Sequence, residues 1–282
     1  MKKIGFIGQG YIGKNYADDF EKRKYKVVRY SIEAEYIKNK ELISKCDIVF
    51  IAVPTPTTPK GFDGSIVEAV LPLVGDGNIA VIKSTILPGM TKSFQKKYPK
   101  ITILHSPEFL SENTAALDAM KPFSNIIGYP IKTEKHIKAS QEVLKVLPKA
   151  PASFTCMSDE SEIIKYVHNC AGYIQIISFN IMYDFAKKIG ADWEVIEKAI
   201  SADPYIPNRY SKPIHKSGRG AGGHCFIKDF SAFKKLYESA VSDSKGLAVL
   251  ETLEKKNIDL LVSSNKDIDI LSGVYGDNII KN

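Results

Sequence analysis

Cys225 is the residue of this chain most suited to nucleophilic chemistry. It follows the glycine-rich stretch Gly220-Ala221-Gly222-Gly223 and stands four residues before Asp229. Glycines let the backbone adopt a positive φ or approach a ligand closely, which suits a reactive thiol better than a structural one. A cysteine in such a loop is nevertheless more often inert than catalytic, so a chemical role requires partners from elsewhere in the chain.

Candidate partners follow two predicted strands. Thr85 comes after a predicted strand at residues 79–83, and Glu108 and Glu112 come after another at residues 101–104. The carboxyl ends of parallel strands meet at one edge of a sheet, where α/β proteins bind their ligands. Hydroxyls and carboxylates at strand ends also serve as turn and helix-capping groups, so their recurrence at one edge is what indicates a site.

A predicted helix supplies two further candidates. Residues 158–189 open with acidic residues suited to a first helical turn and continue with apolar periodicity. Within this helix Lys165 and Asn169 are four residues apart, so their side chains point from one face. Polar residues at such positions are usually exposed, and that alternative stays open on the sequence alone.

A dinucleotide-binding fingerprint lies at the start of the chain. An apolar run at residues 3–7 predicts a strand, and a helical pattern begins at Lys14, after the glycine motif. In this motif the first glycine makes the tight turn, the second admits the pyrophosphate, and the third lets helix and strand pack closely. The residues expected to contact the cofactor are Gly8, Gly10, Tyr11, Ile12, Gly13, Arg29, Ser31, Val53, Pro54, Thr55 and Thr85.

The second predicted strand, residues 26–30, bears on the choice between NAD and NADP. NAD-binding units usually end this strand with an Asp or Glu for the ribose hydroxyls, whereas this chain has Arg29 followed by Tyr30 and Ser31. An arginine without the carboxylate suits a 2′-phosphate, although Glu33 could still reach the ribose and Arg29 could be a solvated charge. We predict NAD, with NADP as the alternative.

The predicted elements form two parts. Apolar strand-like runs alternate with helical patterns over residues 1–157, which predicts an α/β domain with a doubly wound sheet of Rossmann type. Further strands are expected at residues 125–128 and 152–156. The elements after residue 158 are predicted to be all helical, with a second domain over residues 158–265 and a tail over residues 266–282.

Composition narrows the class of protein. With 44% hydrophobic and 25% charged residues and no apolar run long enough to cross a bilayer, we expect a cytoplasmic globular protein with no membrane partner. Its four cysteines form no C-x-x-C pair, so we expect reduced thiols and no metal. The net charge of +7 is spread along the chain without a nucleic-acid-binding motif, so a small anionic substrate is favoured over nucleic acid.

The motifs, in this order, resemble the UDP-glucose/GDP-mannose dehydrogenase family over about residues 2–265. They are Gly8-x-Gly10-Tyr11-x-Gly13, Val53-Pro54-Thr55-Pro56, Lys83-Ser84-Thr85 with Pro88-Gly89, Ser106-Pro107-Glu108-Phe109-Leu110, residues 162–169, and residues 222–229. The resemblance implies NAD-dependent oxidation of a nucleotide-sugar primary alcohol to the carboxylate. It also implies a helical domain like the C-terminal helices of 6-phosphogluconate dehydrogenase, and a homodimer formed through the long helix that begins near Ser158.

The resemblance also implies a role for each candidate residue. Cys225 would capture the aldehyde as a thiohemiacetal that a second oxidation turns into a thioester. Lys165 and Asn169 would stabilise the oxyanion, and Asp229 would position Lys165 and a water. Thr85, with Glu108 or Glu112, would orient the hydrolytic water. The substrate contacts implied are Phe109, Leu110, Arg209 and Gly222, with Arg209 reaching the sugar of the neighbouring subunit.

The chain departs from the family at its C-terminal end. Family members continue into a third domain that grips the nucleotide, whereas this chain ends 53 residues after Asp229. Its residues 267–275 resemble the first strand and turn of that domain. Two alternatives follow: a truncated, catalytically impaired cofactor-binding homologue, and a two-electron β-hydroxyacid dehydrogenase, which would not need Cys225.

Overall fold

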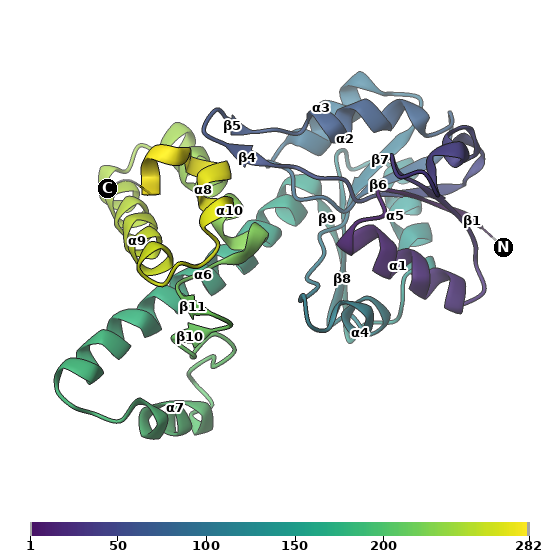
Figure 1. Ribbon diagram of the computed structural model, residues 1–282. Helices are drawn as coiled ribbons and strands as arrows, with labels where there is room; N and C mark the ends of the chain where they lie inside the picture. Colours follow the sequence, from purple (N-terminus) through teal and green to yellow (C-terminus); the bar gives the residue numbers. More distant parts are fainter. Residues whose placement is uncertain (1, 281–282) are drawn as a thin grey trace. The chain divides into compact units, whose positions relative to one another are not determined.

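The computed structural model describes residues 2–280, which form two compact units (Figure 1). Unit 1 comprises Met1–Thr55 and Asp63–Lys165, and unit 2 comprises Pro56–Phe62 and Tyr166–Asn282. Helix α6 (Ser158–Lys188) begins in unit 1 and continues in unit 2, so it supplies residues to both.

Unit 1 is built on a seven-stranded sheet with the order β2-β1-β3-β6-β7-β8-β9. Strands β2, β1, β3, β6 and β7 are parallel, β8 is antiparallel to β7, and β9 is parallel to β8. This arrangement confirms the predicted Rossmann-type α/β fold. The strands are β1 (Lys3–Ile7), β2 (Lys26–Tyr30), β3 (Ile48–Ile51), β6 (Ile79–Ile82), β7 (Thr102–His105), β8 (Ser124–Tyr129) and β9 (Ala152–Met157).

Helices cover both faces of this sheet because side chains alternate along each strand. Phe6 of β1 pairs with Phe50 of β3, and their rings stack 5.1 Å apart in a core that also holds Phe20 of α1. Helices α1, α4 and α5 pack on that face, whereas α2 and α3 lie across the sheet from α1 in Figure 1. The helices of unit 1 are α1 (Tyr11–Lys22), η1 (Ile37–Lys45), α2 (Ser65–Val70), η2 (Leu71–Leu73), α3 (Met90–Lys97), α4 (Ala115–Met120) and α5 (Glu134–Val146).

Unit 2 is helical apart from two hairpins of very short strands. Its core centres on Tyr173 of α6, whose ring stacks 3.9 Å from that of Phe230 on α8, with Leu250 of α9 beside them. The elements of unit 2 besides α6 are β4 (Thr57–Thr58), β5 (Gly61–Phe62), α7 (Trp193–Ala202), β10 (Ile214–His215), β11 (Gly218–Arg219), α8 (Gly223–Ala240), α9 (Ser244–Ser263), α10 (Ile268–Tyr275) and η3 (Asp277–Ile280).

The segment at residues 267–275 is a helix, so its resemblance to a strand and turn is misleading. The alternation of Ile268 and Ile270 with polar residues suggests a strand, but Leu271 and Val274 have helical spacing. Both are buried in α10, against Ile227 of α8 and Leu261 of α9. The C-terminal segment is therefore part of the core of unit 2.

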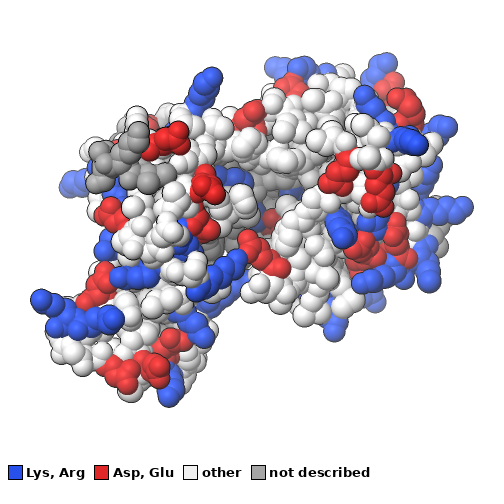
Figure 2. All heavy atoms as spheres, in the orientation of Figure 1, with Lys and Arg blue, Asp and Glu red and all other residues white. Residues whose placement is uncertain are grey.

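Charge distribution and helix hydropathy bear on the kind of surface this protein presents. On the face shown in Figure 2, Lys and Arg side chains are interspersed with Asp and Glu. Within residues 2–280, no helix is long and apolar enough to cross a bilayer. The same part of the chain brings no three His, Cys, Asp or Glu side chains together in a way that could hold a metal ion.

Candidate functional site

In the glycine motif after β1, the first and third glycines are closely packed, whereas the second has open space beside it. A Cβ at Gly8, whose φ is +89°, would lie 2.1 Å from the Ala52 carbonyl oxygen, and one at Gly13 would lie 1.9 Å from the Gly8 carbonyl oxygen. A Cβ at Gly10 would meet no atom within 4 Å. Gly8 and Gly13 therefore require glycine for the fold, whereas Gly10 leaves room for a ligand.

The same loop leads into the N-terminus of α1, which suits an anion. Gly10 is the N-cap residue and provides no side-chain cap, so the first N–H groups of a 12-residue helix point out of its end. The sheet order reverses between β1 and β3, the strands that this loop and Val53 to Thr55 follow. Ligands of doubly wound sheets bind at such a switch point, so these residues fit the pyrophosphate of NAD.

Arg29, the residue that suggested NADP, is already paired. Its guanidinium donates to both carboxylate oxygens of Glu21, at 3.0 and 2.7 Å, and to Asp18 at 2.7 Å. Burial lowers the pKa of Arg29, but the hydrogen bonds and charges of the two carboxylates outweigh it and raise the pKa. The two carboxylates offset its charge, so a 2′-phosphate would have to compete for it.

At the ends of β3 and β6, hydroxyl groups are buried close to the backbone. Ser84 Oγ donates to the Val53 carbonyl at 2.7 Å and accepts from the Val53 N–H at 2.9 Å, which ties the two strand ends together. Thr55 and Thr85 are also buried. Val53 and Ser84 therefore lie side by side at the rim of unit 1 where β3 and β6 end.

Glu108 and Lys165 form a buried pair within unit 1. Lys165 Nζ donates to the Glu108 carbonyl at 2.6 Å and to Glu108 Oε1 at 3.0 Å, and both residues are 4% exposed. Glu108 Oε2 accepts from the Leu110 N–H at 2.8 Å, and Lys165 Nζ lies 5.4 Å from the centre of the Phe109 ring. Phe109 and Leu110 thus flank this ion pair, whereas Glu112 is exposed.

Lys83 is a feature that the sequence reasoning missed. It is 3% exposed, donates to the carbonyl and the hydroxyl of Ser106 at 3.2 Å each, and lies 4.4 Å from the centre of the Tyr16 ring. Burial lowers the pKa of Lys83 to about 8, with the charge of Lys165 adding to the effect and that of Glu108 opposing it. Its place at the end of an apolar strand was the signal that could have found it.

Unit 2 holds a second group of predicted residues. Asn169 of α6 donates to Asp229 Oδ2 at 2.5 Å, and Lys228 Nζ contacts Asp229 Oδ1 at 2.5 Å. Asp229 is 1% exposed. Cys225 is exposed and stands one turn before Asp229 on α8, so both side chains lie on the same side of that helix.

The glycines before Cys225 pack against the protein itself. A Cβ at Gly222 would lie 1.9 Å from Asp267 Oδ2, and one at Gly220, whose φ is +86°, would lie 3.0 Å from Asn257 Oδ1. Gly222 was predicted as a substrate contact, and here its missing side chain makes room for Asp267. Arg209 is exposed in the loop between α7 and β10, with its guanidinium 5.6 Å from the Tyr210 ring.

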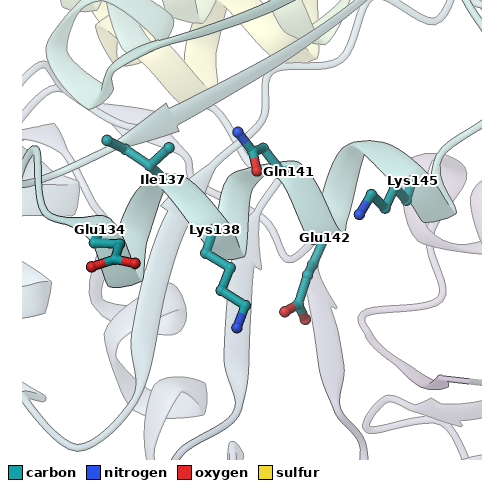
Figure 3. Close-up of a pocket in the computed structure, with 6 residues that line it drawn as sticks. All are labelled: Glu134, Ile137, Lys138, Gln141, Glu142 and Lys145. Atoms are coloured by element: carbon teal, nitrogen blue, oxygen red, sulfur yellow. The ribbon is translucent and has the colours of Figure 1, made fainter.

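A surface hollow of about 430 Å³ lies outside both groups (Figure 3). One face of α5 lines it, and acidic and basic side chains alternate along that face. The lining residues are Glu134, Ile137, Lys138, Gln141, Glu142 and Lys145. Since its charges alternate in sign along one helix and include no predicted site residue, the hollow is not the candidate site.

Comparison with known proteins matches both units to one family. Residues 36–147 match the NAD binding domain of the UDP-glucose/GDP-mannose dehydrogenase family, and residues 159–258 match the central domain of that family. The first match assigns NAD as the cofactor, and the glycine motif agrees with a dinucleotide site.

Individual relatives and a solved structure agree with the family match. The chain is 28% identical to the UDP-glucose 6-dehydrogenase TuaD of Bacillus subtilis, covering 99% of this chain and 68% of that protein. It is 32% identical to the UDP-glucose 6-dehydrogenase of Campylobacter jejuni, covering 84% and 60%. A UDP-glucose dehydrogenase structure from Pyrobaculum islandicum shares the fold, with a TM-score of 0.78 at 24% identity over 96% of this chain and 71% of that one. The chain is thus shorter than these proteins.

Proposed function

Because the chain belongs to the UDP-glucose/GDP-mannose dehydrogenase family, we propose that it oxidises the primary alcohol at C6 of a nucleotide sugar to the carboxylate. One observation carries the proposal: two polar residues one turn apart on α6 each meet a buried carboxylate. Lys165 meets Glu108, and Asn169 meets Asp229. The reaction needs donors for an oxyanion and carboxylates that hold or accept protons, and these four residues supply both.

NAD⁺, when bound, accepts the hydride that leaves the substrate carbon. The chain would hold it through the loop Gly8–Gly13 and the N-terminus of α1, where Gly10 leaves space for the pyrophosphate. Thr55 and Thr85, buried at the ends of neighbouring strands, would line the same rim. The paired state of Arg29 supports NAD over NADP.

Cys225 is the proposed nucleophile. Loss of a hydride from C6 and a proton from its hydroxyl gives the aldehyde, and the Cys225 sulfur then bonds to the aldehyde carbon. The carbonyl electron pair becomes an oxyanion, which Lys165 and Asn169 would stabilise before it takes up a proton to give a thiohemiacetal. A second hydride loss from the same carbon, with loss of the hydroxyl proton, leaves a thioester.

Water completes the reaction by breaking the carbon–sulfur bond, which releases the carboxylate and the thiol. We assign the orientation of this water to Thr85 and Glu108, because Glu108 is buried against Lys165 whereas Glu112 is exposed. The alcohol, one water and two NAD⁺ thus yield the carboxylate, two NADH and three protons. UDP-glucose is the proposed first substrate, since it is named for the relatives above.

Counting reduced cofactor tests this proposal. Purified protein would be mixed with NAD⁺ or NADP⁺ and a panel of nucleotide sugars that includes UDP-glucose, and reduced cofactor would be followed by absorbance. We expect two NADH for each uronate product, loss of activity in Cys225→Ser, and full activity in the control Cys156→Ser on β9. One NADH per product with an active Cys225→Ser would indicate a two-electron dehydrogenase, and NAD binding without turnover a non-catalytic homologue.

The same family membership leads us to propose a cytoplasmic homodimer paired through α6. Apolar side chains at heptad-like spacing are exposed on this helix: Val167 by 61%, Ile174 by 37%, Ile181 by 50% and Phe185 by 66%. Such a stripe suits a second copy of the same helix. Light scattering should give a dimer mass, and Ile181→Glu with Phe185→Glu should give a monomer; a monomeric unaltered chain would contradict this arrangement.

A further inference from the structure

The loop before Cys225 lies flat against the C-terminal part of unit 2. A Cβ at Gly218 would lie 2.6 Å from Ser264 Oγ, and one at Gly222 would lie 1.9 Å from Asp267 Oδ2. Glycine is thus required at alternate positions because α9 and the segment after it lie in the way of any side chain. This close packing connects the reactive loop to residues 257–267, which no sequence motif had linked to catalysis.

Three side chains from this segment bind the loop backbone. Asn257 accepts from the Ala221 N–H at 2.6 Å and donates to the Ala221 carbonyl at 3.0 Å, so it pairs with both polar groups of one residue. Lys266 Nζ donates to the Gly220 carbonyl at 2.9 Å. Asp267 Oδ2 accepts from the Gly223 N–H at 2.7 Å, at the first residue of α8.

Burial and backbone conformation restrict the side chains that make these contacts. Asn257 is 1% exposed and Lys266 is 7% exposed. Burial lowers the pKa of Lys266, so its charge is held at a cost in solvation. Asp267 has a φ of +54°, a left-handed conformation that few residues other than glycine adopt, and which turns the chain between α9 and α10.

We propose that Asn257, Lys266 and Asp267 are positioning residues that set the location of the Cys225 thiol. The inference rests on the proposed function, in which Cys225 attacks the aldehyde. Asp267 fixes the N–H of the residue that opens α8, and Cys225 follows two residues later in the same first turn. Asn257 and Lys266 hold the two residues at the start of the loop. A displacement of about 1 Å at a reacting atom can cost about 100-fold in rate, so the three residues affect the rate by holding the loop that carries the thiol.

The test compares Asp267→Ala and Asn257→Ala with Asp267→Asn, which retains an oxygen that can accept from Gly223. Asp269→Ala, at an exposed position two residues on, is the matched control. Each variant would be checked for folding by circular dichroism. Two measurements follow: the rate at which iodoacetamide alkylates Cys225, read from the mass of its peptide, and kcat with KM for UDP-glucose and NAD⁺.

We expect the two alanine variants to lose at least about 10-fold in kcat and to change the alkylation rate at least about threefold, because the loop is no longer held. KM for NAD⁺ should stay within about twofold, since its predicted contacts lie in unit 1. Asp267→Asn should recover most of the loss, and Asp269→Ala should behave as the unaltered chain. Where Asp267→Ala does not fold, Lys266→Met takes its place, with the same expected loss.

An unchanged alkylation rate in the folded variants would overturn the inference, and so would an unchanged kcat where the unaltered chain turns over. If the unaltered chain oxidises no nucleotide sugar, the proposed function fails. The alkylation series still decides whether Asn257, Lys266 and Asp267 position the thiol, because it needs no turnover.

Discussion

Acid should destabilise unit 1 through His105. This residue is fully buried at the end of β7, with Nδ1 2.8 Å from Ser161 Oγ. Burial, with the charge of Lys83 adding to it, lowers the pKa of His105 to about 3. In the unfolded chain the imidazole takes up a proton near pH 6.5. Between pH 6.5 and 3 the unfolded state therefore binds more protons than the folded state, and stability falls as the pH falls.

The size of the effect follows from these two values. Lowering the pH from 7.5 to 5 should remove about 2 kcal/mol of unfolding free energy through this one group. His105→Asn, which keeps a hydrogen-bonding group near the position of Nδ1 but does not titrate, should lose about 2 kcal/mol less over the same range.

Urea unfolding at several pH values between 5 and 7.5 would measure this difference. Far-ultraviolet circular dichroism reports on both units, whereas the fluorescence of Trp193, the single tryptophan, reports on α7 in unit 2. The pH dependence should therefore appear in the dichroism transition, which includes unit 1, and not in the fluorescence transition of unit 2. If folded His105→Asn lost as much stability as the unaltered chain, the burial argument would be refuted.

Three further predictions concern unit 1. Gly13→Ala should destabilise the fold by more than about 3 kcal/mol in thermal unfolding, because its Cβ would meet a backbone carbonyl. Gly10→Ala should change the unfolding free energy by less than about 0.5 kcal/mol, because its Cβ meets no protein atom, and should weaken NAD⁺ binding about 10-fold in calorimetry. Lys83 loses its proton near pH 8 in the folded state and near pH 10.5 in the unfolded state. Between pH 7.5 and 9.5 the unfolding free energy of the unaltered chain should therefore rise by about 2 kcal/mol relative to that of Lys83→Met. An unfolding free energy, measured with urea, that changes equally with pH in both proteins would contradict this. Glu162 accepts from the N–H groups of Gly89 and Thr91 at the start of α3. In Glu162→Gln the side-chain NH2 group would face one of these N–H donors, so the variant should lose about 2 kcal/mol of unfolding free energy in the same urea assay. An unchanged unfolding free energy would show that water replaces the lost contact.

Local patterns were enough to predict most of unit 1. The strands at residues 3–7 and 26–30 have the predicted bounds, because β-branched and aromatic residues in a short run indicate a strand from neighbouring residues alone. The same local reasoning failed at residues 267–275, where two alternating isoleucines suggested a strand. The burial of Leu271 and Val274 against α8 and α9 selects the helix instead.

Contacts between distant residues were not predictable in this way. The structure pairs Lys165 with Glu108, 57 residues earlier, and Asn169 with Asp229, 60 residues later, and no sequence spacing indicates either pair. Arg29 suggested a 2′-phosphate because the sequence does not show that Asp18 and Glu21 hold it. Lys83 was part of a motif but received no role, because its burial arises only when β6 lies beside β7.

The sequence by itself determined the chemistry available to this protein: a cysteine, a lysine and an asparagine at set spacings, and a glycine motif that opens a dinucleotide site. Those features depend on residue type and on neighbours within one turn or one strand. Only the tertiary structure decided what the glycines before Cys225 are for. They lie against Asn257 and Asp267, more than 30 residues further along the chain, because backbone hydrogen bonds of a loop must be satisfied by whatever the fold brings beside it.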